Sequence, residues 1–325
     1  MKNKPSIPIF FLAENQDVSF LTIAIRSLIE NSSKDYRYLI HILNNGISAR
    51  RADEIAKMQR EDAEIRFVDI GHAVAPISER LNLRDGHTAL NWVRLFLASI
   101  FPQYHKAICL DPDVIVNEDI AQLYQIPLGA HYVGAVADEG IAGRRELSSY
   151  VTEAVGVPSD RYFSSAVLLM NLDAFRMERI EEKFVYLLEN YRFDTLYPDQ
   201  DYLNVLCRDH VLYLDKIWNQ VSEKASRKGS SALIYRPLCR VPIPCERTAY
   251  GALFRQYAVG TPIESELHQL QKHAGFCAYL ARKRERRFLR GEIRRICQQK
   301  TNFRLVLEET PIDRMPWRQR KARHA

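Results

Sequence analysis

Short apolar runs alternate with amphipathic stretches along the first half of the chain. Each run is bounded by polar or turn residues, such as Asn45-Gly46, and has the length of a buried strand. The predicted strands are 7–13, 38–43, 64–70 and 106–110. Between them, apolar residues at helical spacing predict helices over 20–31, 48–59 and 90–100. This alternation indicates βαβ units with right-handed crossovers, and therefore an α/β fold with a mostly parallel sheet.

The second half continues this pattern less regularly. It predicts strands at 132–136 and 167–172 and helices at 180–191 and 201–208. The polar, Gly- and Ser-containing segment 140–160 is expected to be a loop over a ligand site, and 197–200 a loop before the last helix. From about residue 264 the pattern becomes helical and increasingly basic. We therefore expect one domain over 1–260 and a basic, mostly helical extension over 261–325.

The composition, 46% apolar and 26% charged, is that of an ordinary globular protein. No apolar run approaches the roughly 20 residues that a membrane-spanning helix needs. The N-terminus lacks a small-residue cleavage site, so a signal peptide is not expected and a cytoplasmic protein is favoured. The cysteines lie among apolar neighbours without zinc-site spacing, which indicates reduced, buried thiols. They are Cys109, Cys207, Cys239, Cys245, Cys277 and Cys297.

Positive charge is concentrated near the C-terminus. The net charge is +6, but residues 282–325 hold 15 Lys and Arg against 5 Asp and Glu, which is +10 there and −4 elsewhere. Three interpretations stay open: contact with anionic lipid head groups, a solvated helical tail, and contact with nucleic acid. We favour peripheral contact with an anionic membrane and expect no nucleic-acid partner.

Two carboxylates follow the strand predicted at 106–110. Ligands bind at the carboxyl ends of strands in such sheets, so Asp111-Pro112-Asp113 lies where a site is expected. Asp111 and Asp113 can share one hard divalent cation, Mn²⁺ or Mg²⁺, which would neutralise a departing diphosphate. Alternatively both are turn or capping residues, because Asp-x-Asp alone is a weak signal.

The segment around these carboxylates resembles a known family. Residues 108–116, Ile-Cys-Leu-Asp-Pro-Asp-Val-Ile-Val, are similar to the YLDxDxxV segment of retaining glycosyltransferases of family 8. Further segments resemble the family in the same order over roughly 7–220: the opening strand 7–13, the helix around 24–28, the strand and turn 41–48, the strand 65–70, the aromatic-x-Arg-Leu segment 92–95, the FNAGVLLxNL-like block 162–172 and the xDQDxLN-like segment 198–204. The resemblance implies a GT-A-like, Rossmann-related fold, with a mixed, mostly parallel sheet flanked by helices.

The resemblance also implies a UDP-sugar donor and roles for individual residues. Asp111 and Asp113 would bind the cation, and Arg94 would reach the donor's sugar or phosphate unless it is a helix-surface arginine paired with an acid. Asp199 and Gln200 would be the catalytic residues beside the anomeric carbon, although Asp199 could also cap a helix. Retention would follow from front-face attack. The implied donor-binding residues are Ala13, Glu14, Arg94, Asp111, Pro112, Asp113, Ser164, Ser165, Asp199 and Gln200.

Two parts of the expected donor site differ from the family pattern. Glu14 stands where the family has an Asp that pairs with uracil, and Asp17 stands where a Tyr stacks on it. Glu14 can still accept a hydrogen bond from the base, but Asp17 cannot stack. Ser164 and Ala166 replace the Asn and Gly of the FNAGV block, and serine can still donate to a sugar hydroxyl or phosphate.

The late HxxGxxKPW motif differs most. Tyr235 stands at the His that completes the metal site, and Val241 stands at the Lys that holds the diphosphate. Arg236 or Arg240 could supply the missing positive charge, because arginine binds phosphate well. His273 is a less favoured substitute ligand.

These features predict a retaining, metal-dependent glycosyltransferase. It would move a hexose from a UDP-sugar to a cell-envelope glycan or glycolipid, such as lipopolysaccharide core, at the inner face of the plasma membrane. The alternative is a non-catalytic nucleotide-sugar-binding protein on the same fold, which the altered late motif favours. A third interpretation is an unrelated α/β protein with a nucleic-acid-binding tail, and the ordered series of motifs argues against it.

Overall fold

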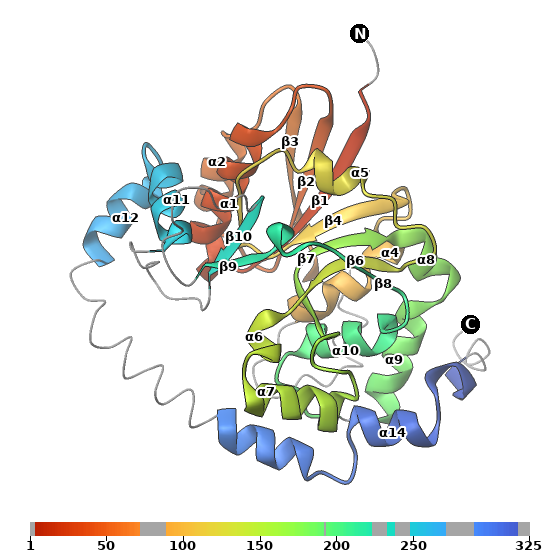
Figure 1. Cartoon of the computed structure of the whole chain (residues 1–325). Coiled ribbons are helices and arrows are strands. Elements are labelled where there is room, and N and C mark those ends of the chain that lie inside the picture. Colours follow the sequence, from red (N-terminus) through yellow and green to blue (C-terminus); the bar gives the residue numbers. More distant parts are fainter. Residues whose placement is uncertain are drawn as a thin grey trace.

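A seven-stranded sheet forms the centre of the molecule (Figure 1). The computed structural model describes residues 4–71, 89–191, 193–222, 233–237, 248–270 and 289–317. In spatial order the strands are β3 (Ala63–Asp69), β2 (Arg37–Asn44), β1 (Ser6–Ala13), β4 (Lys106–Leu110), β7 (Phe163–Asn171), β6 (Val133–Ala137) and β8 (Val211–Tyr213). Strand β7 is antiparallel to both of its neighbours, and the other pairs are parallel. The prediction of a mixed, mostly parallel sheet is therefore confirmed.

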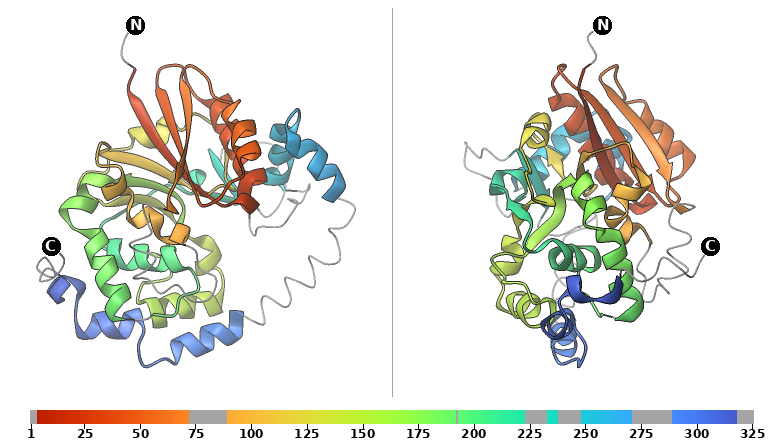
Figure 2. Two further views of the ribbon diagram at one scale, coloured as in Figure 1. Left: turned by 180° about the vertical axis from the view of Figure 1, so that it is seen from behind. Right: turned by 90° about the vertical axis from the view of Figure 1, so that its right-hand side faces the viewer.

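Helices cover both faces of this sheet (Figure 2), so the central strand β1 is buried on both sides. Phe10 and Leu12 point into one hydrophobic cluster, and Ile9 and Phe11 point into the other. The second cluster receives side chains from α1 (Val18–Asn31), α2 (Ala49–Ala56) and α5 (Ala121–Gln125). The first receives them from the 3₁₀ helix Ala89–Leu95, α4 (Leu97–Ile100), α8 (Leu172–Met177), α9 (Ile180–Asn190) and α10 (Pro198–Cys207).

A second, three-stranded sheet lies beside α1. Its order is β5 (Ile115–Val116), β10 (Ile234–Pro237) and β9 (Gln220–Ser222), with β10 antiparallel to β5 and parallel to β9. Helices α11 (Ala249–Ala258) and α12 (Pro262–Leu270) follow it in the chain. Tyr235 of β10 and Phe254 of α11 belong to one small hydrophobic cluster with Ile23 of α1.

Segment 140–160 is helical as far as Val155, so the prediction of a loop over the whole segment was wrong. It contains most of α6 (Glu139–Ala142), α7 (Arg145–Tyr150) and a π-helical turn, Val151–Val155. The reason is a short amphipathic pattern within a polar composition. Leu147, Tyr150, Val151 and Ala154 recur at helical spacing and all bury against the first hydrophobic cluster.

Two predicted helix boundaries also need correction. The helix predicted over 90–100 is a 3₁₀ helix followed by the single turn of α4. Helix α10 begins at Pro198, three residues before the predicted start, and Tyr197 occupies the N-cap position. Proline at the first helical position needs no hydrogen-bond donor there. Asp199 and Gln200 therefore lie in the first turn of a helix, and Asp199 is not its N-cap.

The C-terminal segment 289–317 packs on the first hydrophobic cluster, along the foot of the molecule in Figure 1. Residues 289–297 are helical, and α14 (Phe303–Glu309) follows. Phe303 packs against Phe193 and Tyr202, with ring centroids 4.0 and 4.7 Å away. The division into 1–260 and 261–325 stays a prediction, but residues 289–317 share a core with the preceding chain.

Cys109 and Cys207 are buried free thiols, as predicted, and burial raises the pKa of Cys109 to about 12. Cys297 is a partly buried free thiol, and the other three cysteines lie outside the described residues. Within the described part of the chain, no helix is both long and apolar enough to span a membrane.

Candidate functional site

A polar pocket of about 440 Å³ opens at the carboxyl ends of β1 and β4. These parallel strands are neighbours, so the residues after them, Glu14 and Asp111, come to the same edge of the sheet. Strand β7 runs the other way, which brings Ser165, near its N-terminal end, to that edge too. The pocket is lined by Leu12, Glu14, Gln16, Asp17, Leu90, Arg94, Asp111, Pro112, Ser165, Leu196, Tyr197, Pro198, Asp199 and Gln200.

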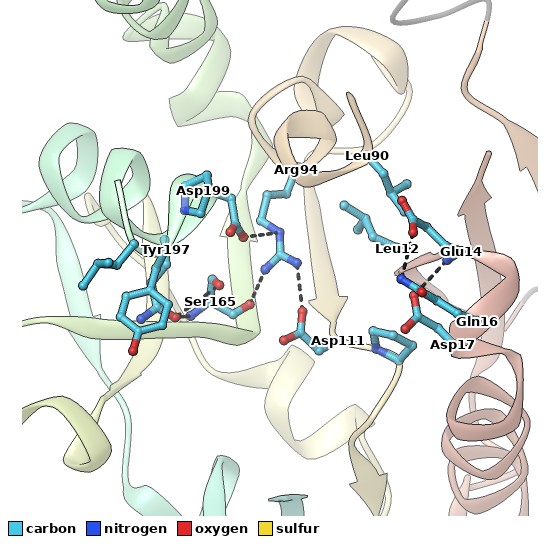
Figure 3. A pocket seen from close by; sticks show the side chains of 14 residues that line it. Leu12, Glu14, Gln16, Asp17, Leu90, Arg94, Asp111, Ser165, Tyr197 and Asp199 are labelled. Carbon is cyan, nitrogen blue, oxygen red and sulfur yellow. Dashed lines mark hydrogen bonds and ion pairs between the residues drawn. The ribbon is translucent and has the colours of Figure 1, made fainter. Parts of the chain in front are cut away.

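Arg94 lies at the centre of this pocket, between carboxylates from two elements (Figure 3). Its Nη2 donates to Oδ1 of Asp111 at 2.8 Å, and its Nε lies 3.1 Å from Oδ2 of Asp199. Its Nη1 donates to the backbone carbonyl of Ser165 at 2.6 Å. The side chain is only 6% exposed, so Arg94 is not on a helix surface, although it is paired with acids as that alternative expected.

The electrostatics of this ion-pair network follow from burial. Burial disfavours the charged guanidinium, but the carboxylates of Asp199 and Asp111 outweigh it and hold the pKa of Arg94 above its ordinary value. Burial also raises the pKa of Asp199, and Arg94 offsets this only in part. The result is a fixed positive charge between two carboxylates, in a place where water is largely excluded.

The end of the pocket next to β1 is built by a tight turn. Glu14 and Asp17 form a reciprocal capping box at the 3₁₀ turn Asn15–Asp17, and the Glu14 backbone N–H donates to Oδ2 of Asp17 at 2.9 Å. The Gln16 amide donates to Glu14 Oε2 at 3.0 Å. These bonds hold three polar side chains at one end of the pocket, with Leu12 and Leu90 as its apolar lining.

The opposite end is built by the first turn of α10 against β7. Gln200 Oε1 accepts from the backbone N–H of Ser165 at 2.8 Å and from its hydroxyl at 3.3 Å. One turn later, the Asn204 side chain makes two hydrogen bonds to the backbone of Phe163. Its Oδ1 accepts from the Phe163 N–H and its Nδ2 donates to the Phe163 carbonyl, both at 2.8 Å. Two amide side chains therefore dock α10 onto β7 and fix the orientation of Gln200 in the pocket.

Most of the predicted donor-site residues meet in this pocket. Those that line it are Glu14, Arg94, Asp111, Pro112, Ser165, Asp199 and Gln200. Ala13 instead packs in the second hydrophobic cluster, and Ser164 and Asp113 are buried beside the pocket without lining it. Sequence reasoning missed Gln16, Leu196 and Tyr197 as lining residues. Tyr197 adjoins the xDQDxLN-like segment, so an aromatic residue directly before that motif was an available signal.

The carboxylate pair fits a divalent cation only in part. Asp111 faces the pocket and Asp113 is 8% exposed two residues further on. Among the described residues, no three His, Cys, Asp or Glu side chains cluster in a way that could hold a metal ion. Mg²⁺ is commonly held by one or two carboxylates with substrate phosphates and water. The ligand set therefore suits a cation whose coordination a bound diphosphate completes.

The two residues of the late motif region singled out above that the structure describes, Tyr235 and Arg236, do not line the pocket. Tyr235 is 4% exposed, pairs with Ile115 in the small sheet and packs in the cluster around Phe254. Arg236 forms an ion pair at 3.0 Å with Asp138, whose side chain also caps α6. Val241, Arg240 and His273 lie outside the described residues.

Solved structures with this architecture define the class of the fold. The chain superposes on the bifunctional glycosyltransferase WbbM with a TM-score of 0.72 at 19% identity, covering 83% of this chain and 52% of WbbM. It superposes on a mutant of LgtC with a TM-score of 0.62 at 21% identity, covering 79% and 96% of the two chains. The fold is thus that of the GT-A glycosyltransferases. The chain belongs to glycosyltransferase family 8, whose family model, described as "Glycosyl transferase family 8", matches residues 8–235.

Curated relatives agree with this membership. Glycosyltransferase GlyB of Streptococcus pneumoniae is 29% identical over 217 residues, 65% of this chain and 47% of GlyB. Lipopolysaccharide 1,2-glucosyltransferase of Escherichia coli is 31% identical over 139 residues, 41% of this chain and 39% of that protein. The alignments thus span less than half the length of these two relatives.

Proposed function

We propose that this chain is a retaining glycosyltransferase that moves a hexose from a UDP-sugar to a cell-envelope glycan or glycolipid such as lipopolysaccharide core. The observation that carries the proposal is Arg94, buried between Asp111 and Asp199 in a polar pocket at the carboxyl edge of the sheet. Arg94 orients the Asp111 carboxylate, on which a divalent cation would neutralise a diphosphate leaving group. The similarity to the lipopolysaccharide glucosyltransferase and to an LgtC complex with donor and acceptor sugar analogues supports the choice of donor and acceptor.

The two ends of the pocket suit the two ends of such a donor. We assign the nucleoside to the end with Glu14, whose carboxylate can accept from a base N–H. We assign the hexose to the end with Asp199 and Gln200. Asp111 and Asp113 would hold Mn²⁺ or Mg²⁺, which supplies charge neutralisation for the diphosphate.

Front-face attack fits the carboxylates better than a covalent sugar–enzyme intermediate. A nucleophilic carboxylate would have to face the anomeric carbon, and an ion-pair partner makes it less reactive. Asp111 and Asp199 are both paired with Arg94, which stabilises their charge and lowers their reactivity. The anomeric carbon's bond to the phosphate oxygen would therefore break as its bond to the acceptor oxygen forms, and the departing phosphate would take the acceptor's proton. Gln200, held by Ser165, would contribute an oriented amide dipole.

Titration of the purified protein with UDP by calorimetry tests the donor site. With Mn²⁺ we expect binding in roughly the micromolar range, about −8 kcal/mol, and much weaker binding without it. Mn²⁺ alone should give no detectable heat, because the described ligands are incomplete without the diphosphate. Asp113→Asn should remove the Mn²⁺ dependence. Absence of UDP binding with and without Mn²⁺ would overturn the proposed donor.

A non-catalytic nucleotide-sugar-binding protein is the second candidate. The observation that favours it is Tyr235, which fills the family's metal-binding His position and is packed in a hydrophobic cluster. Slow hydrolysis of UDP-glucose or UDP-galactose with Mn²⁺ would exclude this candidate. UDP binding with no turnover of either sugar, in water or with a glycolipid acceptor, would support it.

We also propose that the basic C-terminus contacts the anionic inner face of the plasma membrane, where such acceptors lie. Arg290 and Arg295 are partly engaged by Glu146 and Asp194, so the charges at 318–323 are the better target for a test. Replacing Arg318, Arg320, Lys321 and Arg323 by Gln should weaken sedimentation with phosphatidylglycerol vesicles at low salt. Equal sedimentation of both proteins would refute the contact. Deleting 282–325 is the poorer test because it removes Phe303 from the core.

A further inference from the structure

The first turn of α10 carries a second carboxylate, Asp201, which is fully buried and does not line the pocket. Its two oxygens have separate partners. Oδ1 accepts from the Tyr162 hydroxyl at 2.5 Å. Oδ2 accepts from the Tyr150 hydroxyl at 2.6 Å and from the backbone N–H of Tyr197 at 3.2 Å. Three donors from three segments thus converge on one carboxyl group. Burial raises the pKa of this group to about 7, although the three hydrogen bonds act in the opposite direction.

The Oδ2 side of this network reaches the pocket wall. The Tyr150 hydroxyl, besides donating to Asp201, accepts from the backbone N–H of Leu196 at 2.9 Å. Leu196, Tyr197 and Pro198 all line the pocket at the end assigned to the hexose. The segment 193–197 has no regular secondary structure, so hydrogen bonds from its backbone tie the wall to α7 and α10. The Tyr197 carbonyl adds one more, because it accepts from the Asp201 backbone N–H at 2.7 Å. The bond from Leu196 is the one that needs the Tyr150 hydroxyl.

The Oδ1 side of this network reaches Gln200, which also lines the pocket at the end assigned to the hexose. The Tyr162 hydroxyl interacts with the side chain of Gln200 as well as with Asp201. Gln200 is the lining residue that Ser165 holds from the opposite direction. Both tyrosines are fully buried, so neither can touch a donor or an acceptor directly.

From this arrangement we propose that Asp201, through Tyr150 and Tyr162, is a positioning residue that fixes the hexose end of the pocket. Tyr150 positions the wall at Leu196 and Tyr197, and Tyr162 positions Gln200. The hydrogen bonds that hold Glu14 at the nucleoside end come from Gln16 and Asp17, and they do not involve Asp201, Tyr150 or Tyr162. Loss of the network should therefore affect the sugar and leave the nucleotide in place. This assignment of ends rests on the proposed function.

Tyr150→Phe is the decisive variant, because it removes one hydroxyl and keeps the ring in the core. Its matched control is Tyr202→Phe. Tyr202 is the next residue after Asp201, is equally buried, and its hydroxyl has no hydrogen-bond partner among the described residues. Both variants lose the same atom within one core, so a difference between them reports the network and not the loss of a buried hydroxyl in general.

Three measurements are made on each variant and on the parent protein. The first is amide hydrogen exchange of a peptide covering 193–198, which contains the Leu196 and Tyr197 amides. The second is the kcat for hydrolysis of UDP-glucose and UDP-galactose with Mn²⁺, and the third is the Kd for UDP. For Tyr150→Phe we expect faster exchange and a Kd for UDP within about twofold of the parent value. We expect kcat to fall at least about tenfold, because a small misplacement of reacting groups lowers the rate by that much or more. Tyr202→Phe should match the parent in all three.

Each failure has a separate meaning. If Tyr150→Phe exchanges no faster than Tyr202→Phe, the wall is not held by this network and the proposal is wrong. If its exchange rises while kcat stays at the parent value, the network is structural only and the positioning role is wrong. If the parent binds neither UDP nor a UDP-sugar, the proposed function fails, and the exchange comparison alone still decides whether Tyr150 holds the wall.

Discussion

Arg94 and Asp111 are 17 residues apart in the chain, yet their Nη2 and Oδ1 atoms lie 2.8 Å apart across the mouth of the pocket. Arg94 comes from a 3₁₀ helix on one face of the sheet, and Asp111 from the end of a central strand. The pair therefore links the helical layer to the sheet at the point where the donor is proposed to bind.

We predict that Arg94→Met destabilises the fold as well as the site. The methionine would leave the carboxylates of Asp111 and Asp199 near each other without a counter-charge, and breaking such a buried pair costs about 3–5 kcal/mol. Urea unfolding measures this change. Arg37→Met is the control, because its ion pair with Glu64 is exposed and such pairs contribute about 0–1 kcal/mol. Equal stability of the two variants would contradict the prediction.

Asn204 is predicted to be a structural anchor of α10. Its side chain makes three buried hydrogen bonds, two to Phe163 and one to the carbonyl of Gln200. Asn204→Ala leaves the Phe163 backbone groups unpaired, at about 1–3 kcal/mol for each buried group. Asn190→Ala, which removes an exposed bond to the carbonyl of Tyr186, should change the unfolding free energy by less than about 0.5 kcal/mol. A neutral Asn204→Ala variant would show that α10 does not depend on this anchor.

His41 is predicted to make stability fall in acid. It is 2% exposed, its Nε2 lies 2.8 Å from the Tyr104 hydroxyl, and burial, with a smaller effect of Arg66, lowers its pKa from 6.5 to about 4. A neutral imidazole is favoured in the folded state, so its contribution is complete above pH 6.5 and is lost as the pH falls through about 4.

His41→Leu tests this linkage. Between pH 7 and pH 4, the melting temperature of the parent protein should fall more steeply than that of the variant, because leucine binds no proton on unfolding. The comparison uses the slope with pH and not the absolute stability, which the substitution also alters. Parallel slopes would mean that His41 does not titrate differently in the folded and unfolded chain.

Phe303 is predicted to hold the C-terminal segment in the fold. Its ring is 2% exposed and packs on Phe193 and Tyr202. Phe303→Ala should lower the unfolding free energy by about 3–5 kcal/mol through lost burial and a residual cavity. Leu305→Ala in the same helix α14 is the control, because Leu305 is only partly buried. A cost no larger than that of the control would indicate that 289–317 is dispensable for the core.

Local sequence patterns were sufficient for most of the sheet and for much of the site. Strands β1, β2, β3 and β4 were predicted within one residue at either end, because each is a compact apolar run with polar boundaries. Asp111 follows from its position directly after a buried strand, whereas Glu14 was named from the family resemblance at the end of the first strand. Residues at strand ends can be predicted from the sequence. Alternating strands and helices form a parallel sheet, and the carboxyl ends of its strands all lie at one edge.

The sequence by itself determined the α/β class, the central strands and the family resemblance. Only the tertiary structure decided that Tyr235 is a core residue, that most of segment 140–160 is helical, and that Tyr150, Tyr162 and Asp201 form one network. Their partners lie far apart in the chain, as Tyr150 and Leu196 do. Periodicity reports whether a residue is buried, whereas a buried polar group is stable only if a specific partner reaches it, and folding in three dimensions selects that partner.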